Sequence, residues 1–381
     1  MGQARRRARG KRKGWHMQTG RDAIESLIHR RKADHTPHFD SPWGDTLRKW
    51  VGQGMPADDK GNPVDAGEHF GYDMVCCGGW FDWHPRRGFS ETVEETDEWK
   101  ITRNGSGAVL KYWKNKSGTP EHIDFHMTSR AVWEKEYKPL LSPFDRQRVG
   151  DVAAVRANLE RARSQGKWAF FGSTLVWENM RGSMGDYAMY MALVEDPEWI
   201  HDFCRSMVDL YKKCYSILFD EAGLPDGIWI YEDLGYKGRL FCSPGTLEDV
   251  VFPYFREMVE FFHNRGLPVI LHSCGYQEEA LPLIVQAGFD GLNPMEVKAG
   301  NDIFKFAESY GDRLMFVGGL DERILESRDR DVIRRGVTDF IKGMKERGAR
   351  FVYGSDHSLS TNIDYGDYLY SLEIYRQQCM L

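Results

Sequence analysis

The stretch PVILHSCG (residues 268–275) decides the fold class of this 381-residue chain. An uninterrupted apolar run is followed directly by His272, Ser273 and Cys274. Continuous apolar runs are typical of strands that are buried on both faces of a parallel sheet. We therefore expect a largely parallel sheet, because six further runs of this kind occur, at residues 37–40, 168–172, 227–233, 289–294, 314–319 and 350–355.

Helical segments separate most of these runs. Asp196 and Pro197 supply an N-cap and a first-turn proline for a helix that Gly223 ends. Pro253 should break or kink the next helix, which spans residues 243–266. The periodicity predicts further helices at residues 151–165, 277–287, 301–310, 329–347 and 364–378.

The alternation of strands and helices implies βαβ units and an α/β fold. A (β/α)8 TIM barrel is favoured over a doubly wound sheet, because no glycine-rich phosphate-binding motif follows a strand. Only seven strands are recognised, so one strand of such a barrel is missed. Residues 70–130 are rich in Trp and Gly without a helical period, and they predict β-hairpins inserted into the barrel or covering its mouth.

Composition and charge narrow the class of protein. The chain is 41% hydrophobic and 28% charged, which fits a globular protein with a sizeable core. Residues 1–16 hold seven basic residues and no acid, and we expect a disordered basic tail there, followed by a single domain at 17–381. The formal net charge is −6, so the rest of the chain is acidic, which argues against nucleic-acid binding.

No uncharged apolar run approaches the roughly 18 residues of a membrane helix. Seven scattered Cys indicate a reducing, cytoplasmic location.

Polar residues gather where the predicted strands end. In a barrel these carboxyl-terminal ends converge on one face, where active sites are built. A single buried carboxylate there would say little, but several together predict a site. The residues concerned are Asp40, Glu232, Asp233, His272, Cys274, Asn293, Glu296, Asp321, Ser355, Asp356 and His357.

His272 and Cys274 give the most specific chemical signal. They lie two residues apart on a predicted strand, so both side chains point to the same side. Neighbouring nitrogen and sulfur donors suit Zn²⁺. The alternative is a core histidine beside a buried thiol. Further zinc ligands would come from other strand ends, and the candidates are Glu232, Asp356 and His357, with Cys242 less favoured because it lies on a loop or helix start.

A second group follows the strand that ends at Gly172. Trp177, Glu178 and Arg181 are placed to line a pocket for an aromatic or anionic substrate. The alternative is packing together with a surface ion pair.

Several stretches together resemble the uroporphyrinogen decarboxylase superfamily, over residues 18–378. They are GSTLVWENMRG (172–182), EDPEW (195–199), LHSCG (271–275), FDGLNP (289–294), FVGGLD (316–321) and GSDHS (354–358). The resemblance implies a (β/α)8 barrel. In the decarboxylases, an Arg-rich segment after the first strand grips substrate carboxylates. Here that place holds FDSPWGDTLRKW (39–50) without paired arginines, which counts against decarboxylation.

The superfamily's corrinoid-dependent methyltransferase branch implies zinc on His-x-Cys and a distant Cys. His272 and Cys274 match the first two ligands, whereas Ser355 or Asp356 stands near the place of the third. Replacing a thiolate by a carboxylate or imidazole leaves a more Lewis-acidic metal, better suited to polarising an ether oxygen. We therefore expect a methyltransferase that moves a methyl group from an O-methyl donor to the cobalt of a separate corrinoid (cobalamin) protein.

The expected roles follow from this hypothesis. Zn²⁺ would be held by His272 and Cys274 with one or two of Glu232, Asp356 and His357. Catalytic residues would be Asp233, His357 and Glu232, with Asp233 or His357 giving a proton to the leaving oxygen. Substrate would be oriented by Asp40, Trp177, Arg181 and Tyr231. Three alternatives stay open, namely methyl transfer from a methylcorrinoid to a thiol or folate, decarboxylation of a porphyrinogen-like acid, and a non-catalytic protein that handles a corrinoid or metal.

Overall fold

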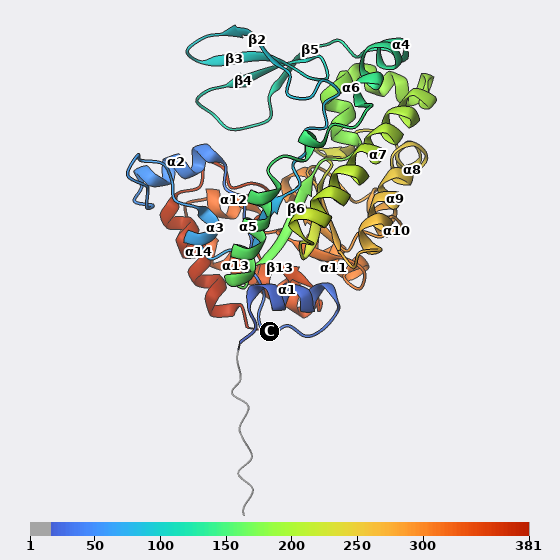
Figure 1. Ribbon diagram of the computed structural model, residues 1–381. Helices are drawn as coiled ribbons and strands as arrows, with labels where there is room; N and C mark the ends of the chain where they lie inside the picture. The colour runs from blue at the N-terminus through green and yellow to red at the C-terminus, as the bar shows by residue number, and fades with distance from the viewer. Residues whose placement is uncertain (1–16, 381) are drawn as a thin grey trace, which may run out of the picture.

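The computed structural model describes residues 17–380, and its centre is a curled, seven-stranded parallel sheet (Figure 1). Neighbouring strands follow the order β1-β6-β7-β10-β11-β12-β13. The predicted parallel α/β sheet is therefore confirmed. The strands are β1 (Met74–Gly78), β6 (Trp168–Ser173), β7 (Gly227–Tyr231), β10 (Val269–Ser273), β11 (Gly291–Pro294), β12 (Met315–Val317) and β13 (Phe351–Val352).

A short segment closes the gap between β13 and β1. The amide of Phe39 donates to the carbonyl of Tyr353, and the amide of Tyr353 donates to the carbonyl of Pro37. On the other side, the amide of Asp73 donates to the carbonyl of His38. The predicted run at 37–40 therefore occupies the eighth position of a TIM-barrel-like fold. The strand that the sequence pattern missed is β1.

Helices cover the outside of the sheet (Figure 1). The larger ones on the barrel are α5 (Val152–Ser164), α6 (Trp177–Glu195), α7 (Pro197–Ala222), α8 (Pro244–Val250), α9 (Phe252–His263), α10 (Leu281–Gln286), α11 (Ile303–Tyr310), α12 (Glu322–Glu326), α13 (Arg330–Glu346) and α14 (Tyr365–Gln378). Before β1 come α1 (Gly20–Ile28), α2 (Gly44–Gly52) and α3 (Ala66–His69). Shorter helical segments are α4 (Arg130–Val132), η1 (Trp133–Tyr137), η2 (Lys138–Leu141), η3 (Arg146–Val149) and η4 (Val297–Ala299).

Helix boundaries follow the expected local chemistry. The carboxylate of Asp196 accepts the amide of Trp199 and caps α7, whose first residue is Pro197 and whose C-cap is Gly223. Pro253 lies in the first turn of α9, and the predicted long helix is divided into α8 and α9 there. Both helix predictions are confirmed.

The inserted region forms an antiparallel sheet beside the upper end of α6 (Figure 1). Its order is β2-β3-β4-β5, with β2 (Ser90–Glu95), β3 (Trp99–Asn104), β4 (Ala108–Trp113) and β5 (Glu121–Phe125). The prediction of β-hairpins near 70–130 is confirmed, with one correction, because β1 lies inside that range and belongs to the barrel. A separate two-stranded ribbon pairs β8 (Gly235–Tyr236) with β9 (Arg239–Leu240).

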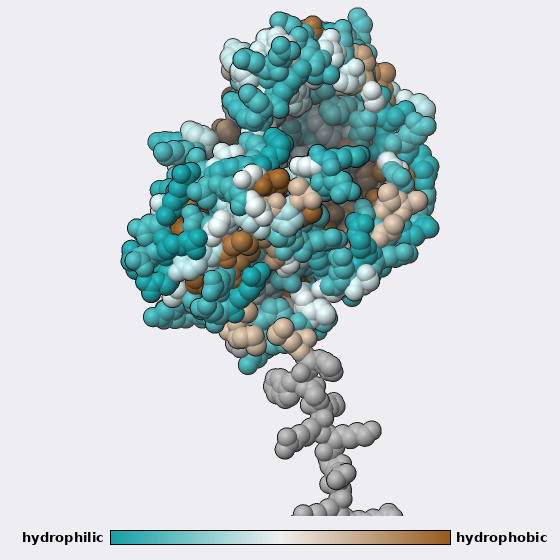
Figure 2. Space-filling model, turned by 90° about the vertical axis from the view of Figure 1, so that its left-hand side faces the viewer, coloured by the Kyte–Doolittle hydropathy of each residue, from teal (hydrophilic) through white to brown (hydrophobic). Residues whose placement is uncertain are grey.

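The core is formed by apolar strand residues packed against the helices around them. Met189 on α6 is fully buried, whereas Met191 on the same helix is 40% exposed. The face in Figure 2 is mainly hydrophilic, with scattered apolar residues. Among residues 17–380, no helix combines the length and apolar character needed to cross a bilayer. The predicted basic tail at 1–16 lies outside the described residues.

Candidate functional site

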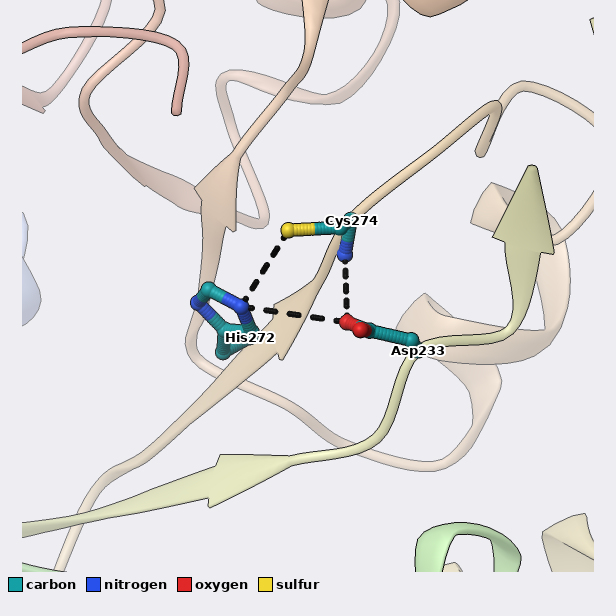
Figure 3. A group of neighbouring side chains, drawn as sticks. All are labelled: Asp233, His272 and Cys274. Atoms are coloured by element: carbon teal, nitrogen blue, oxygen red, sulfur yellow. Dashed lines mark hydrogen bonds and ion pairs between the residues drawn. The ribbon is translucent and has the colours of Figure 1, made fainter. Parts of the chain in front are cut away.

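The ends of β7 and β10 bring three potential metal ligands together (Figure 3). His272 and Cys274 point to the same side, as the strand period predicted, with 3.4 Å between the imidazole Nε2 and the thiol Sγ. Asp233 follows β7, and its Oδ1 lies 3.8 Å from His272 Nε2. The same Oδ1 accepts the amide of Cys274 at 2.8 Å, which fixes the two strand ends against each other.

Cys274 also belongs to a second group, with Glu296 and His357. One ligand atom from each residue lies within 4.8 Å of the others. Glu296 follows β11, and its Oε2 accepts the amide of Gly275 at 2.9 Å. His357 follows β13. Four strand ends therefore supply one thiol, two imidazoles and two carboxylates around a single sulfur.

The orientation of the His272 ring is set by its other nitrogen. Nδ1 lies 2.5 Å from Asn293 Oδ1, and the amide nitrogen of Asn293 donates to the carbonyl of Val317 at 2.8 Å. Because Asn293 presents its oxygen to the ring, Nδ1 carries the hydrogen and Nε2 keeps its lone pair. A histidine that binds a metal through one ring nitrogen usually donates such a hydrogen bond from the other.

The electrostatics of this cluster fit a bound cation. Burial, followed by the negative charges of Asp233 and Glu296, raises the pKa of Cys274 well above its ordinary value. Burial lowers the pKa of His272, which favours the neutral ring. A neutral imidazole and a thiol surrounded by carboxylates gain most from a divalent cation, which stabilises the thiolate. The nitrogen, sulfur and oxygen donors are those that Zn²⁺ takes.

Glu232 is a correction to the expected ligand set. Its side chain is buried on the other side of β7, and its carboxylate accepts the amides of Leu175, Trp177 and Glu178. Burial raises its pKa well above the ordinary value. Glu232 therefore anchors the start of α6. It is placed neither to bind a metal in the cluster nor to donate a proton into the cavity. Adjacent strand residues face opposite sides, so Asp233 takes the position at the cluster.

Asp356 is the second correction. Its fully buried carboxylate accepts the amides of Val297 and Glu322, at 2.7 and 2.8 Å. Burial raises its pKa to about 6. It therefore holds two loops at the barrel mouth together, while Glu296 and His357 supply the ligand atoms near Cys274.

A cavity of about 240 Å³ opens beside the cluster, and we call it the mouth cavity. Asp40 and Tyr231 line it, and their role in binding substrate stays a prediction. The ring of Tyr231 lies 5.0 Å from the ring of His272. The complete lining is Phe39, Asp40, Ser41, Trp43, Trp229, Tyr231, His272, Asn293, Pro294, Ser355, His357 and Ser358.

Trp177 and Arg181, also expected to bind substrate, do not line this cavity. Trp177 is fully buried at the start of α6. Arg181 forms ion pairs with Glu178 and Asp186, at 2.8 and 3.0 Å. The alternative interpretation of this group, packing with an ion pair, describes its geometry better.

The sequence profile of uroporphyrinogen decarboxylase (URO-D) matches residues 173–373, more than half of the chain. The chain belongs to this family. The chain is similar in fold to a solved structure described as a "methyltransferase from Methanosarcina mazei", with a TM-score of 0.65. The two chains are 16% identical, and the match covers 94% of this chain and 98% of the other. A putative vitamin-B12-independent methionine synthase from Listeria monocytogenes is a more distant match, at a TM-score of 0.43 and 14% identity over 90% and 97% of the two chains. No curated protein matches the chain in sequence.

Two residues at the site were not predicted as metal ligands or substrate-binding residues. Glu296 was recognised at a strand end but not as a ligand. Trp43 lines the mouth cavity, and its ring lies 6.4 Å from that of His357. Trp43 follows Asp40 closely in FDSPW, so an aromatic residue just beyond a strand-end acid was the available signal.

Proposed function

We propose that this protein is a zinc-dependent methyltransferase that removes a methyl group from a small O-methyl donor and passes it to the cobalt of a separate corrinoid protein. The observation that carries the proposal is the arrangement around Cys274, where one sulfur and one imidazole meet carboxylates at the edge of a small cavity. Membership of the uroporphyrinogen decarboxylase family and a fold shared with a structure described as a methyltransferase agree with it.

His272 and Cys274 are the zinc ligands in this proposal. Asp233, Glu296 and His357 are the candidates for the remaining positions, in place of Glu232 and Asp356. When bound, the zinc supplies a Lewis acid that polarises the oxygen carrying the methyl group. A set with one thiolate and hard oxygen donors suits this role better than a set of several thiolates.

The residues of the mouth cavity position the donor. Trp43, Trp229 and Tyr231 present aromatic walls, and polar groups of Asp40 and His357 lie among them. A volume of about 240 Å³ admits a small donor and no corrin ring, so the cobalt must approach from the open side. Asp233 and His357 are the candidates, within the ligand cluster, for giving a proton to the leaving oxygen.

Methyl transfer to a reduced corrinoid tests the proposal. The zinc-loaded protein is mixed with cob(I)alamin or a cob(I)-corrinoid protein and a panel of methoxylated compounds, and formation of methylcobalt is followed by absorbance. We expect transfer from at least one donor. Transfer should be lost in Cys274→Ala but not in Cys379→Ser, a control variant that removes a thiol near the C-terminus.

Other outcomes identify the alternatives. Turnover of methylcobalamin with free thiols or folate, and none with methoxylated compounds, would reverse the direction of transfer. Decarboxylation of a porphyrinogen that survives complete chelation would overturn the zinc hypothesis. Binding of a corrinoid protein without turnover of any donor would indicate a non-catalytic partner.

A further inference from the structure

Asp40 is a buried carboxyl group in the wall of the mouth cavity. It ends the segment at 37–40 that closes the barrel, and only 7% of the residue is exposed. Within residues 17–380, no lysine, arginine or histidine forms an ion pair with it. A buried carboxylate without a counter-charge is costly, so the surroundings of Asp40 favour the neutral acid.

The hydrogen bonds of the Ser355 hydroxyl favour a proton on Asp40. The hydroxyl oxygen of Ser355 lies within hydrogen-bond distance of both Asp40 Oδ1 and the carbonyl of His357. That hydroxyl has a single hydrogen, and a carbonyl can only accept. Both bonds form at once when Ser355 donates to the carbonyl and Asp40, as a carboxylic acid, donates to Ser355. An ionised Asp40 would leave two acceptors competing for the hydroxyl hydrogen, and its Oδ1 would then keep only the amide of Ser355, at 3.3 Å, as a donor whenever the hydroxyl turns to the carbonyl.

The second carboxyl oxygen meets only neutral groups. The hydroxyl of Tyr368 lies 3.3 Å from Asp40 Oδ2, 3.3 Å from His38 Nε2 and 3.1 Å from the hydroxyl of Tyr72. Burial, aided by Arg376, lowers the pKa of His38 to about 3, so its ring is neutral near neutral pH. The cluster behind Asp40 therefore offers hydrogen bonds but no positive charge.

We propose that Asp40, in place of Asp233 or His357, is the general acid of the reaction, and that it gives its proton to the oxygen from which the methyl group leaves. This inference rests on the proposed function. The bond between the methyl carbon and oxygen breaks, and its electron pair stays on oxygen. The co-substrate cobalt(I) supplies the electron pair of the new cobalt–carbon bond and becomes cobalt(III). The proton of Asp40 leaves its hydrogen bond with Ser355 and moves to the oxygen. The demethylated alcohol or phenol leaves, and Asp40 regains a proton from water in the cavity.

The acidity of Asp40 agrees with this role. Burial raises its pKa to about 7, against the opposing effect of hydrogen bonds from Ser355 and Tyr368. General acids work best when their pKa lies near the working pH. The titratable groups around it are His38, Tyr72, Tyr353 and Tyr368 on the buried side and Tyr231, His272 and His357 in the cavity.

Donors that differ in leaving group test the proposal. The zinc-loaded Asp40→Asn variant is assayed with an alkyl or unactivated phenyl methyl ether and with a methyl nitrophenyl ether, whose phenolate leaves without a proton. We expect a loss of roughly 100-fold or more in kcat for the first donor, and a loss of only a few-fold for the second. Equal losses for both donors would overturn the role as acid and leave only positioning.

Infrared spectroscopy tests the protonation state without turnover. The wild-type holoenzyme is expected to show a protonated-carboxyl band that disappears as pH rises through about 7 and that is missing in Asp40→Asn. If Asp40→Asn does not fold, Tyr368→Phe assigns the band, because removing the hydroxyl near Oδ2 should shift its frequency. A wild-type spectrum at pH 6 without such a band would contradict the proposal.

The two hypotheses fail in different ways. If wild-type protein transfers no methyl group from any donor, the proposed function fails while the infrared band is still open to observation. If the wild type transfers methyl groups and Asp40→Asn keeps its zinc and the full rate for both donors, the role of Asp40 fails alone.

Discussion

Two cavities of this molecule differ in size and in chemistry, because the larger one lacks the cluster of potential metal ligands that borders the smaller mouth cavity. A groove of about 570 Å³ lies between β5 and the middle and end of α6. Its walls include Phe125, Met184 and Met191. Arg130, the cation of its lining, is paired with Glu134 and Asp196, and the other charged residues of the lining are Asp124, Asp186 and Glu195. The mouth cavity has less than half that volume, yet it adjoins both candidate metal clusters found in the described part of the chain.

The difference follows from how each hollow is built. The mouth cavity lies where parallel strands end, so successive strands deliver polar side chains to one place. The groove lies between an antiparallel sheet and a helix, where facing side chains are selected for packing. Its backbone shows this, because a Cβ on Gly185 would lie 2.5 Å from the ring of Phe125. Position relative to the strand ends, rather than size, therefore indicates the functional site.

The largest predicted effect concerns Glu232, which anchors the start of α6 beside the barrel mouth. Glu232→Ala leaves two buried amides and one partly buried amide without an acceptor, and we expect it to lower the free energy of unfolding by about 4 kcal/mol. Glu195→Ala at the edge of the groove removes an exposed carboxylate, and this should change the free energy of unfolding by less than about 0.5 kcal/mol. Urea unfolding of both variants measures the contrast. Equal, small changes would show that Glu232 does not anchor α6.

The next effect concerns the orientation of a ligand. Asn293→Ala removes the oxygen that accepts from His272 Nδ1, and we expect zinc affinity to fall by about 10- to 100-fold. Competition with a chelator of known affinity measures this fall. Asn293→Asp keeps an acceptor at the same place and should retain most of the affinity. Wild-type affinity in Asn293→Ala would mean that the hydrogen bond does not hold the ring for a metal.

A pH-dependent effect distinguishes Asp40 from carboxylates at the surface. Its pKa of about 7 in the fold lies above the ordinary value of 3.8, so its contribution to stability is complete below about pH 4 and is lost as pH rises to about 7. Relative to Asp40→Asn, the wild type should lose about 1.4 kcal/mol per pH unit across this window. Unfolding at several pH values measures the difference. A constant difference would contradict a protonated Asp40.

The smallest effect is expected in the groove. Tyr187 lines it and is 82% exposed, so Tyr187→Ser should change the free energy of unfolding by less than about 0.5 kcal/mol. Methyl transfer should stay within about twofold of the wild-type rate. A tenfold loss of activity in a well-folded variant would show that the groove takes part in the reaction.

Most barrel strands were predictable because burial on both faces leaves an apolar run. β1 was missed, since its MVCCG run is short, partly exposed and followed by glycines and a tryptophan rather than by a polar strand end. The inserted sheet was recognised from the absence of a helical period. Where the inserted region begins was not predictable, because both β1 and the hairpins read as non-helical sequence.

The pairing of His272 with Cys274 was predictable because the strand period alone places them on one side. The choice between Glu232 and Asp233 was not, since neighbouring residues at a strand end face opposite sides and the sequence does not reveal which side faces the cavity. Asp356 and His357 pose the same problem. Trp177 and Arg181 lie on α6, whose rotation toward or away from the cavity depends on tertiary packing.

Zinc content measured on purified protein tests the central claim most directly. Wild type, His272→Ala, Cys274→Ala and Cys379→Ser are dialysed against buffer with trace zinc, and metal per chain is determined by mass spectrometry. We expect about one zinc ion per chain in the wild type and in Cys379→Ser, and almost none in the other two variants. Unchanged zinc in His272→Ala and Cys274→Ala, or a wild type that binds none, would contradict it.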